Sequence, residues 1–299
     1  MFNFTKYSKI YYAISIILVV ASVASLFIFG LKFGIEFTGG STIELEFKDA
    51  RPNNDQISSA LNDIDLGSIV IQPTGEKGLV LKLKGIDEAT HQQVLSKINE
   101  LSVSGERNFQ YIGPSVGNEL KSKTQLAVLI SLLAITLYIA FAFRGVSRPV
   151  SSWKYGITSL IALFHDILIP LGVFSIMGHY YGIEITIPII AALLTVLGFS
   201  VHDTIVVFDR IRENLSHGKG SFDEIVNVSL NQTLGRSIST VLTTLIVLIS
   251  VFFFGGETLK YFSLALILGI TSGAYSSIFI ASPLLVSWHR WSESKRDRN

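Results

Sequence analysis

The sequence contains no cysteine and comparatively few charged residues. The absence of cysteine excludes disulfide bonds, thiolate metal sites and cysteine nucleophiles. Charged residues make up 16% of the chain, well below the roughly 25% typical of soluble proteins. The formal net charge is only +1, so no global basic field indicates a nucleic-acid partner.

What the sequence has instead is a series of long apolar runs, with the charges gathered between them. A bilayer core about 30 Å thick requires roughly 20 apolar helical residues. The first run follows Lys6 and Lys9, as a signal peptide would, but it is longer than a typical signal core, and we expect an uncleaved span. Six runs predict transmembrane helices: 10–30, 124–143, 155–178, 185–208, 237–254 and 261–287.

Basic residues in the short loops predict the orientation of these spans. They collect after the second, fourth and sixth spans, at Arg144, Arg148, Lys154, Arg210, Arg212, Lys219, Arg236, Arg290, Lys295, Arg296 and Arg298. The opposite short loops hold only Glu184, Glu257 and Lys260. We therefore expect the terminal segments 1–9 and 288–299 in the cytoplasm and the long segment 31–123 outside.

The outer segment 31–123 reads as a small α+β domain. Predicted strands are 42–47, 68–72, 79–83 and 107–112, and predicted helices are 54–64, capped by Asn53 or Asn54, and 87–101. The order strand, helix, strand, strand, helix, strand is the split βαβ pattern of ferredoxin-like domains. The glycine-rich stretches 34–40 and 113–117 predict tight turns where the chain leaves and re-enters the membrane.

The segment 209–235 between the fourth and fifth spans carries a short apolar stripe at Phe222, Ile225, Val226 and Leu230. An amphipathic helix lying along the inner membrane surface is the structural interpretation. Binding of a cytoplasmic partner is the alternative.

Two acidic residues interrupt the spans, and each follows a histidine: His165-Asp166 and His202-Asp203. Ionisable groups inside a bilayer are costly and therefore candidates for function. Asp203 falls in the inner half of the fourth span, at a depth where Arg236 at the start of the fifth could meet it. Such a carboxyl group is stable as the anion when paired and as the acid when unpaired, which makes a proton-operated switch. A static ion pair is the alternative.

Asp166, in the middle of the third span, is either a second protonatable site or a neutral acid bonded to another helix. Adjacent helical residues point about 100° apart, so we expect the side chains of His165 and His202 to point away from the acids. A His-Asp doublet also occurs in metal hydrolases, but the other histidines here lie in the outer domain, loops and tail, which argues against a metal site.

Small and hydroxyl residues crowd the fifth and sixth spans. Close helix packing is one interpretation, and a hydrated proton path facing Asp203 is the other. The residues concerned are Ser237, Ser239, Thr240, Thr243 and Thr244 in the fifth span and Gly269, Ser272, Gly273, Ala274, Ser276 and Ser277 in the sixth.

The order of these features resembles the SecF family of protein-export membrane subunits over essentially the whole chain. The most specific stretch is LTVLGFSVHDTIVVFDRIREN at 194–214, supported by NVSLNQTLGRSISTVLTT at 227–244 and by Phe254-Gly255-Gly256. FGIEFTGGS at 33–41 and GPSVGNEL at 113–120 match at the edges of the outer domain, with Glu36 where the family more often has Asp. The related SecD subunits carry a much larger outer region, so the small domain favours SecF.

The resemblance implies an RND-superfamily membrane fold in the bacterial cytoplasmic (inner) membrane. It implies SecD as the partner that completes a twelve-helix unit, and cooperation with the SecYEG channel, the SecA motor and a translocating unfolded preprotein. YidC and YajC are further candidate partners. It also implies use of the proton-motive force, with Asp203 and Arg236 needed for proton flow and the proton as coupling ion in place of any cofactor.

Two rival functions remain open at this stage. An RND-type exporter of small molecules usually carries two six-span halves on one chain, and a drug-accumulation assay would reveal it. If the chain is a purely structural translocon subunit, its effect on protein export would be the same with and without an uncoupler. An intramembrane enzyme is not supported, because the spans hold no nucleophile-base set or metal site.

Overall fold

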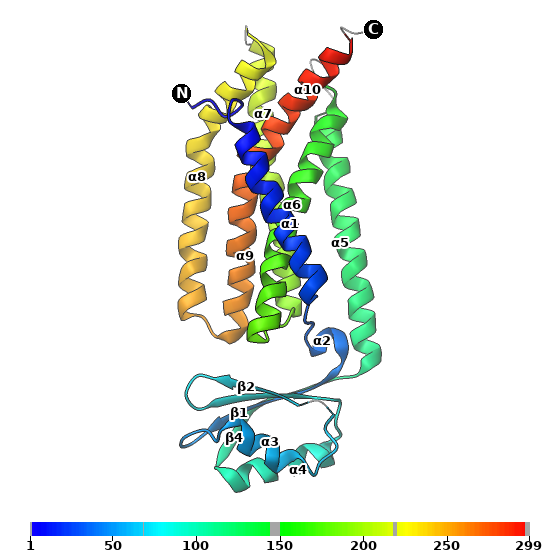
Figure 1. Cartoon of the computed structure of the whole chain (residues 1–299), viewed down its shortest axis with the longest axis vertical. Helices are drawn as coiled ribbons and strands as arrows, with labels where there is room; N and C mark the ends of the chain where they lie inside the picture. The colour runs from blue at the N-terminus through cyan, green and yellow to red at the C-terminus, as the bar shows by residue number, and fades with distance from the viewer. Residues whose placement is uncertain (1, 68, 144–149, 218–219, 297–299) are drawn as a thin grey trace. The chain divides into compact units, whose positions relative to one another are not determined.

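The computed structural model of the 299-residue chain describes residues 2–67, 69–143, 150–217 and 220–296. The chain forms two compact units (Figure 1). The first comprises Met1–Lys32 and Leu126–Asn299, and the second comprises Phe33–Gln125. Four of the basic residues used to predict orientation, Arg144, Arg148, Lys219 and Arg298, lie outside the described residues, as does Ser68 of a predicted strand.

The first unit is helical. Its helices are α1 (Ser8–Phe29), the later part of α5 (Pro114–Ala142), α6 (Ser152–Tyr181), α7 (Ile187–His217), α8 (Phe222–Phe254) and α9 (Glu257–Ser276). A π-helical turn η1 (Ser277–Ala281) and α10 (Ser282–Arg296) continue directly from α9. Counting that run as one, the described residues contain six helices long and apolar enough to cross a membrane. The predicted fold class of six spans with one small α+β unit is confirmed.

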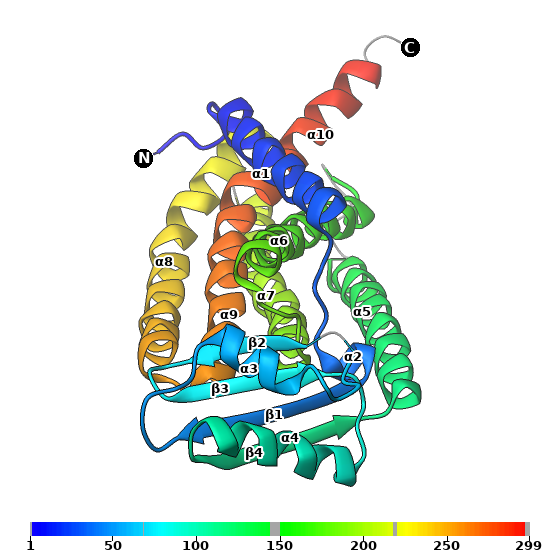
Figure 2. The same cartoon turned by 60° about the horizontal axis from the view of Figure 1, so that its bottom comes forward.

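Helices α6, α7 and α9 form the centre of the first unit, with α1 packed on α6 and α8 packed on α7 and α9 (Figures 1 and 2). Glycine permits two of these close approaches. A Cβ atom on Gly172 would lie 2.5 Å from Cβ of Ser22, and one on Gly269 would lie 2.3 Å from a methyl group of Val196. Gly269 of the sixth span therefore serves helix packing, as one of the two interpretations of that span proposed.

Helices α5 and α8 present broad apolar surfaces in the isolated chain. Leu137 on α5 is 69% exposed, and Phe253 and Phe254 on α8 are 70% and 90% exposed. Apolar surface of this extent marks contact with lipid or with another protein.

The segment between the fourth and fifth spans differs from the prediction. Helix α7 continues to His217 and α8 begins at Phe222, so most of the segment extends the two membrane helices. Phe222, Val226 and Leu230 are buried in the same apolar cluster as Phe208 of α7 and Leu285 of α10. A helix lying along the membrane surface was therefore the wrong expectation, because the apolar stripe is buried by packing on the protein itself.

The N-terminal residues, the start of α8 and α10 meet at one end of the first unit. The backbone N–H groups of Phe2 and Phe4 donate to the side chains of Asn231 and Asn227 on α8. Arg290 of α10 pairs with Asp223 in the first turn of α8. These contacts hold both chain ends beside the α7–α8 junction.

The second unit is a four-stranded sheet with two helices. Its strands are β1 (Gly40–Phe47), β2 (Val70–Thr74), β3 (Gly78–Leu83) and β4 (Ser104–Ile112), and its helices are α2 (Ile35–Thr38), α3 (Asn54–Leu61) and α4 (Glu88–Leu101). The sheet order is β2-β3-β1-β4, and every neighbouring pair is antiparallel. This order, with α3 and α4 as the crossover helices, is the split βαβ topology.

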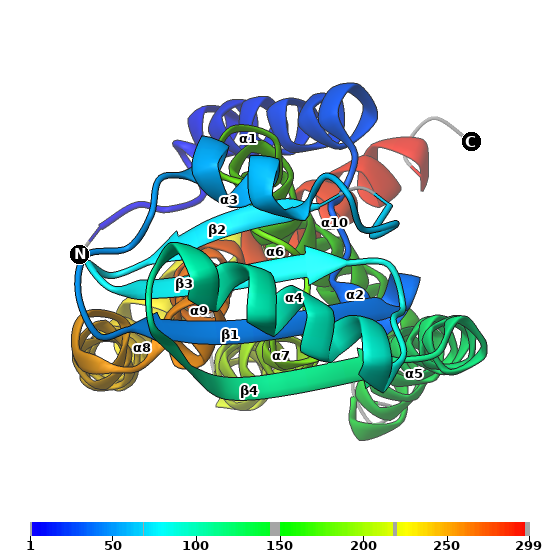
Figure 3. The ribbon, with the colours of Figure 1, turned by 90° about the horizontal axis from the view of Figure 1, so that it is seen from below.

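The core of the second unit lies between the sheet and the helices α3 and α4, which cover one face (Figure 3). Alternate residues of β1, Ile43, Leu45 and Phe47, are buried there, as expected of a strand with one face in a core. Ile57 of α3 and Val94 of α4 face them. Asn53 caps α3 through a reciprocal capping box with Gln56. Leu101, the last residue of α4, is 41% exposed.

The two glycine-rich edges of the second unit lie against each other. Gly39 has φ 74°, and a Cβ atom there would lie 3.0 Å from Cα of Pro114. A Cβ atom on Gly117 would lie 3.0 Å from the backbone N of Gly39. Pro114 is the first residue of α5, where proline is well tolerated, so the predicted turn at 113–117 is instead the start of a helix. The predicted turn at 34–40 contains the short helix α2, which Gly39 and Gly40 end.

Candidate functional site

Both acidic residues of the spans lie at the middle of long helices and are shielded from solvent. Asp166 of α6 is 0% exposed and Asp203 of α7 is 8% exposed. Ser200 of α7 donates a hydrogen bond to Asp166 and is three residues before Asp203. Three helical residues rise by about 4.5 Å, so the part of α7 that contacts Asp166 is about one turn from Asp203. The predicted pair of intramembrane acids is therefore a pair of neighbouring sites.

Asp203 has one satisfied and one unsatisfied oxygen. Its Oδ1 accepts a hydrogen bond from Ser237 Oγ on α8 at 2.6 Å. Its Oδ2 is buried and has no hydrogen-bond partner within the described residues. A buried polar atom without a partner costs free energy in any protein, and more so away from water. One atom of this carboxyl group is thus free to take a proton or a new donor.

The predicted ion pair between Asp203 and Arg236 is absent from the described part of this structure. Arg236 is exposed on α8, while Ser237, the next residue, faces Asp203. Successive residues of a helix are separated by about 100°, so a helix that aims Ser237 inward turns Arg236 toward its outer side. The sequence pattern predicted that Asp203 and Arg236 lie at a similar depth in the membrane. It did not predict how α8 is rotated about its own axis.

The other predicted supporting residues do not contact Asp203. Thr243 Oγ1 donates to backbone oxygens of its own helix, and Thr244 Oγ1 donates to the carbonyl of Thr240 at 2.9 Å. Thr240 and Thr243 are exposed, as is His202 on α7. The hydroxyl group of the fifth span that donates a hydrogen bond to Asp203 is instead that of Ser237.

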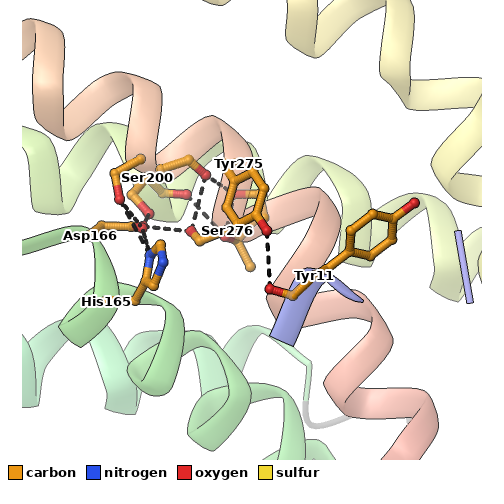
Figure 4. Close-up of polar contacts among 10 residues, drawn as sticks. Tyr11, His165, Asp166, Ser200, Tyr275 and Ser276 are labelled. Atoms are coloured by element: carbon orange, nitrogen blue, oxygen red, sulfur yellow. Dashed lines mark hydrogen bonds and ion pairs between the residues drawn. The ribbon is translucent and has the colours of Figure 1, made fainter. Parts of the chain in front are cut away.

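Asp166 has a complete set of donors around it, drawn from three helices (Figure 4). Its Oδ2 accepts from Ser200 Oγ of α7 at 2.5 Å and from Ser276 Oγ of α9 at 2.7 Å. Its Oδ1 accepts from Ser272 Oγ of α9 at 3.1 Å and contacts His165 Nδ1 at 2.9 Å. An ionised carboxylate offers about four acceptor positions, and four donors surround this one.

His165 contacts its sequence neighbour, contrary to the expectation that the two side chains point apart. The Nδ1 atom lies 2.9 Å from Asp166 Oδ1, and the ring is 5% exposed. The angle of about 100° between adjacent helical residues describes only the directions of their Cβ atoms. Rotation about the side-chain torsions of His165 brings its ring across the helix surface to Asp166. The Nε2 atom of the ring is buried and makes no hydrogen bond within the described residues.

Further hydroxyl groups of α7 and α9 lie next in sequence to the residues of the two acidic sites. Ser276 on the Asp166 side is followed by Ser277, whose Oγ lies 2.9 Å from Thr204 Oγ1. Thr204 directly follows Asp203, and its Oγ1 also contacts the carbonyl oxygen of Ser200 at 3.0 Å. Ser277 begins the π-helical turn η1, a distortion that is often found at functional sites.

The sequence signalled these hydroxyls only indirectly. Ser272, Ser276 and Ser277 were singled out as small residues of the sixth span, and the i, i+4 spacing of the first two places them on one helix face. Ser200 lay inside the family signature without a role. Only the crossing of α6, α7 and α9 assigns three serines to one carboxylate.

No lysine or arginine pairs with either acid among the described residues, so each site holds a carboxyl group, hydroxyls and, at Asp166, an imidazole. Carboxyl and imidazole groups are able to accept and donate protons. The chemistry that the arrangement supports is proton transfer within the helical unit.

Comparison with known proteins identifies the family. The family described as "Protein export membrane protein SecD/SecF, C-terminal" matches residues 92–291, and the "SecD/SecF GG Motif" matches residues 24–50. The latter range contains Gly39 and Gly40, whose positive φ angles end α2. Each of the two matches includes residues of both units.

Similar curated proteins are protein translocase subunits SecF. The one from Thermobaculum terrenum is 40% identical, over 96% of this chain and 94% of its own length. The one from Desulfurispirillum indicum is 41% identical, over 92% of this chain and 88% of its own length.

A solved structure shares the fold. The crystal structure of SecDF, a translocon-associated membrane protein from Thermus thermophilus, superposes with a TM-score of 0.86 at 32% identity. The alignment covers 97% of this chain and 39% of SecDF, so the chain spans about two fifths of that longer protein. Sequence and structure agree that this chain belongs to the SecD/SecF family of protein-export membrane proteins, as a SecF subunit.

Proposed function

We propose that this SecF subunit uses the proton-motive force to promote late steps of protein export across the bacterial cytoplasmic membrane. The observation that carries the proposal is Asp203: a carboxyl group in the middle of a membrane span with one buried oxygen that has no partner. A group so placed changes its charge with little cost to existing contacts, because among the described residues Oδ2 has no hydrogen-bond partner and Oδ1 accepts a bond from Ser237.

The proposed partner within the membrane is SecD. The SecDF match supports it, because the chain aligns with less than half of that longer protein. The exposed apolar surfaces of α5 and α8 leave room for a second helical unit. SecYEG, SecA and the translocating preprotein complete the proposed assembly, with YidC and YajC as further partners.

The orientation proposed for this assembly places both termini in the cytoplasm and the second unit on the outer side. Lys154 of α6, Arg290 of α10 and Arg210 of α7 support it, because each belongs to the end of the first unit where the N-terminal residues contact α8. Basic residues favour the cytoplasmic side of a membrane.

The proposed cycle moves Asp203 between two partners. In the structure the carboxyl group is bonded to Ser237, and Arg236 stands one residue earlier on the same helix. A partial rotation of α8, together with the reach of the arginine side chain, brings the guanidinium group to the carboxylate. Protonation of Asp203 releases Arg236 and favours the state with Ser237. One charge crossing 100 mV supplies about 2.3 kcal/mol, enough to bias such an equilibrium by more than tenfold.

The test is the variant Asp203→Asn in membrane vesicles that carry the complete export machinery. Export of a preprotein is measured with a proton gradient and with an uncoupler. We expect the gradient to stimulate export by the unchanged protein and by Asp203→Glu, and to have no effect with Asp203→Asn. Full stimulation of Asp203→Asn would refute the switch and favour a purely structural subunit. Co-purification of SecD with each variant confirms that assembly is intact.

A further inference from the structure

His165 has an acceptor atom that the described structure leaves unused. Its Nδ1 contacts Asp166 Oδ1 at 2.9 Å and Ser272 Oγ at 3.3 Å, while its Nε2 is buried with no hydrogen-bond partner among the described residues. The ring is 5% exposed, so this is a titratable group inside the helical unit and not a surface histidine.

The contact with Asp166 fixes the tautomer of a neutral His165. Three serine hydroxyls already donate to the carboxyl group, which is the environment of an ionised carboxylate. An ionised oxygen 2.9 Å from Nδ1 requires a proton on Nδ1. The neutral ring then carries its lone pair on Nε2, where it has no donor.

We propose that His165, through Nε2, is the proton-accepting atom of the Asp166 site, and that Asp166 stays ionised as its counter-ion. A hydronium ion transfers a proton to Nε2 and is left as water, and the ring becomes an imidazolium that keeps its Nδ1–H bond to Asp166. No existing hydrogen bond breaks. The site changes from a net charge of −1 to 0, which is favourable because an unpaired charge inside a membrane is costly.

The surroundings of the ring leave this pair free of other charges. On α9 the ring of Tyr275 stacks on His165 with centroids 6.1 Å apart, and its hydroxyl donates to the backbone oxygen of Tyr11 on α1 (Figure 4). On α7 the titratable residues that follow Ser200 are His202, which is exposed, and Asp203, one helical turn away. Among the described residues the nearest charge to the imidazole is therefore the carboxylate that it contacts.

This inference rests on the proposed function for its purpose, since it adds a second proton-binding position to the proposed path. The two positions are close in the fold, because Ser200, which donates to Asp166, is one helical turn from Asp203 on α7. In that arrangement one proton is held by an imidazole–carboxylate pair and the other by a single carboxyl group.

The test is nitrogen NMR of the full-length protein in lipid bilayers, with all six histidines labelled in the ring. The His165→Asn variant, whose amide replaces the Nδ1 donor but has no Nε2, identifies the signals of His165. His202→Asn is the matched control, because His202 belongs to the other His-Asp doublet and its side chain is exposed.

We expect the neutral ring of His165 to hold its proton on Nδ1 and, when the sample is acidified, to take a second proton on Nε2 while Nδ1 stays protonated. In Asp166→Asn the affinity of the ring for its second proton should fall by about tenfold or more, because its counter-ion is gone. A neutral ring protonated on Nε2, or an Nε2 that takes up no proton on acidification, would overturn the inference. The NMR measurement does not depend on protein export. Its result for His165 therefore stands apart from the outcome of the export assay with Asp203→Asn.

Discussion

Helix α7 packs against α9 beside both acidic sites, and Gly269 is a point of close approach between the two helices. A Cβ atom on Gly269 would lie 2.3 Å and 2.7 Å from the two methyl groups of Val196 and 3.0 Å from its Cβ. Rotating the valine about χ1 exchanges one methyl for the other and leaves its Cβ in place. Since carbon atoms separate by about 3.5 to 4.0 Å in good contact, Gly269→Ala requires the helices to move apart by roughly 1 Å.

The expected cost follows from two opposing effects. Overpacking a close contact costs about 1–3 kcal/mol, while replacing a helical glycine by alanine returns up to about 1 kcal/mol. Gly198→Ala on α7 is the matched control, because nothing lies within 4 Å of the atom that it adds. The free energy of unfolding of Gly269→Ala should therefore lie about 1–3 kcal/mol below that of Gly198→Ala.

Reversible unfolding in mixed detergent micelles, followed by helical circular dichroism, measures this difference. Val196→Ala removes the methyl groups that the new atom meets, so the double variant Gly269→Ala/Val196→Ala should recover about 1–3 kcal/mol relative to the sum of the single changes. Equal stability of Gly269→Ala and Gly198→Ala, or strict additivity in the double variant, would refute the close-contact argument.

Two further predictions concern single hydrogen bonds. Ser237→Ala leaves both oxygens of Asp203 without a partner and should lower the free energy of unfolding by about 1–3 kcal/mol, whereas Ser239→Ala, at an exposed position of the same helix, should have little effect in the same assay. The pKa of Asp87 is lowered because its carboxylate accepts hydrogen bonds from the side chain and backbone of Thr90 at the start of α4. A lowered folded-state pKa means that this stabilisation is complete above the ordinary value of 3.8 and is lost as the pH falls through the folded-state value. Hydrogen exchange at the Thr90 amide should therefore accelerate in acid. The variant Asp87→Ala should abolish that pH dependence.

The sequence predicted the elements of the fold because each has a strong local signal. Runs of apolar residues long enough for a bilayer identify the spans, and an alternating pattern such as Ile43, Leu45 and Phe47 identifies a strand. The ends of elements were less certain. Helix α7 extends nine residues beyond the predicted end at 208, to His217, because apolarity marks the part of a helix in lipid and not its whole length.

The candidate site was predicted in part. Asp166 and Asp203 were found because charged residues within apolar runs are rare and costly. Their partners were not found: Asp203 contacts Ser237 and not Arg236, and Asp166 is surrounded by serines from two other helices. Only the rotation of each helix about its axis decides which of two adjacent residues faces a neighbour.

The sequence by itself determined which residues lie in the membrane spans, how many spans there are, and which two acids lie within them, because these properties depend on local composition and length. The tertiary structure alone decided that His165 binds its neighbour and that Ser200, Ser272 and Ser276 converge on Asp166. The physical reason is that helix crossings bring together residues distant in the chain, and small changes in helix rotation exchange one set of contacts for another.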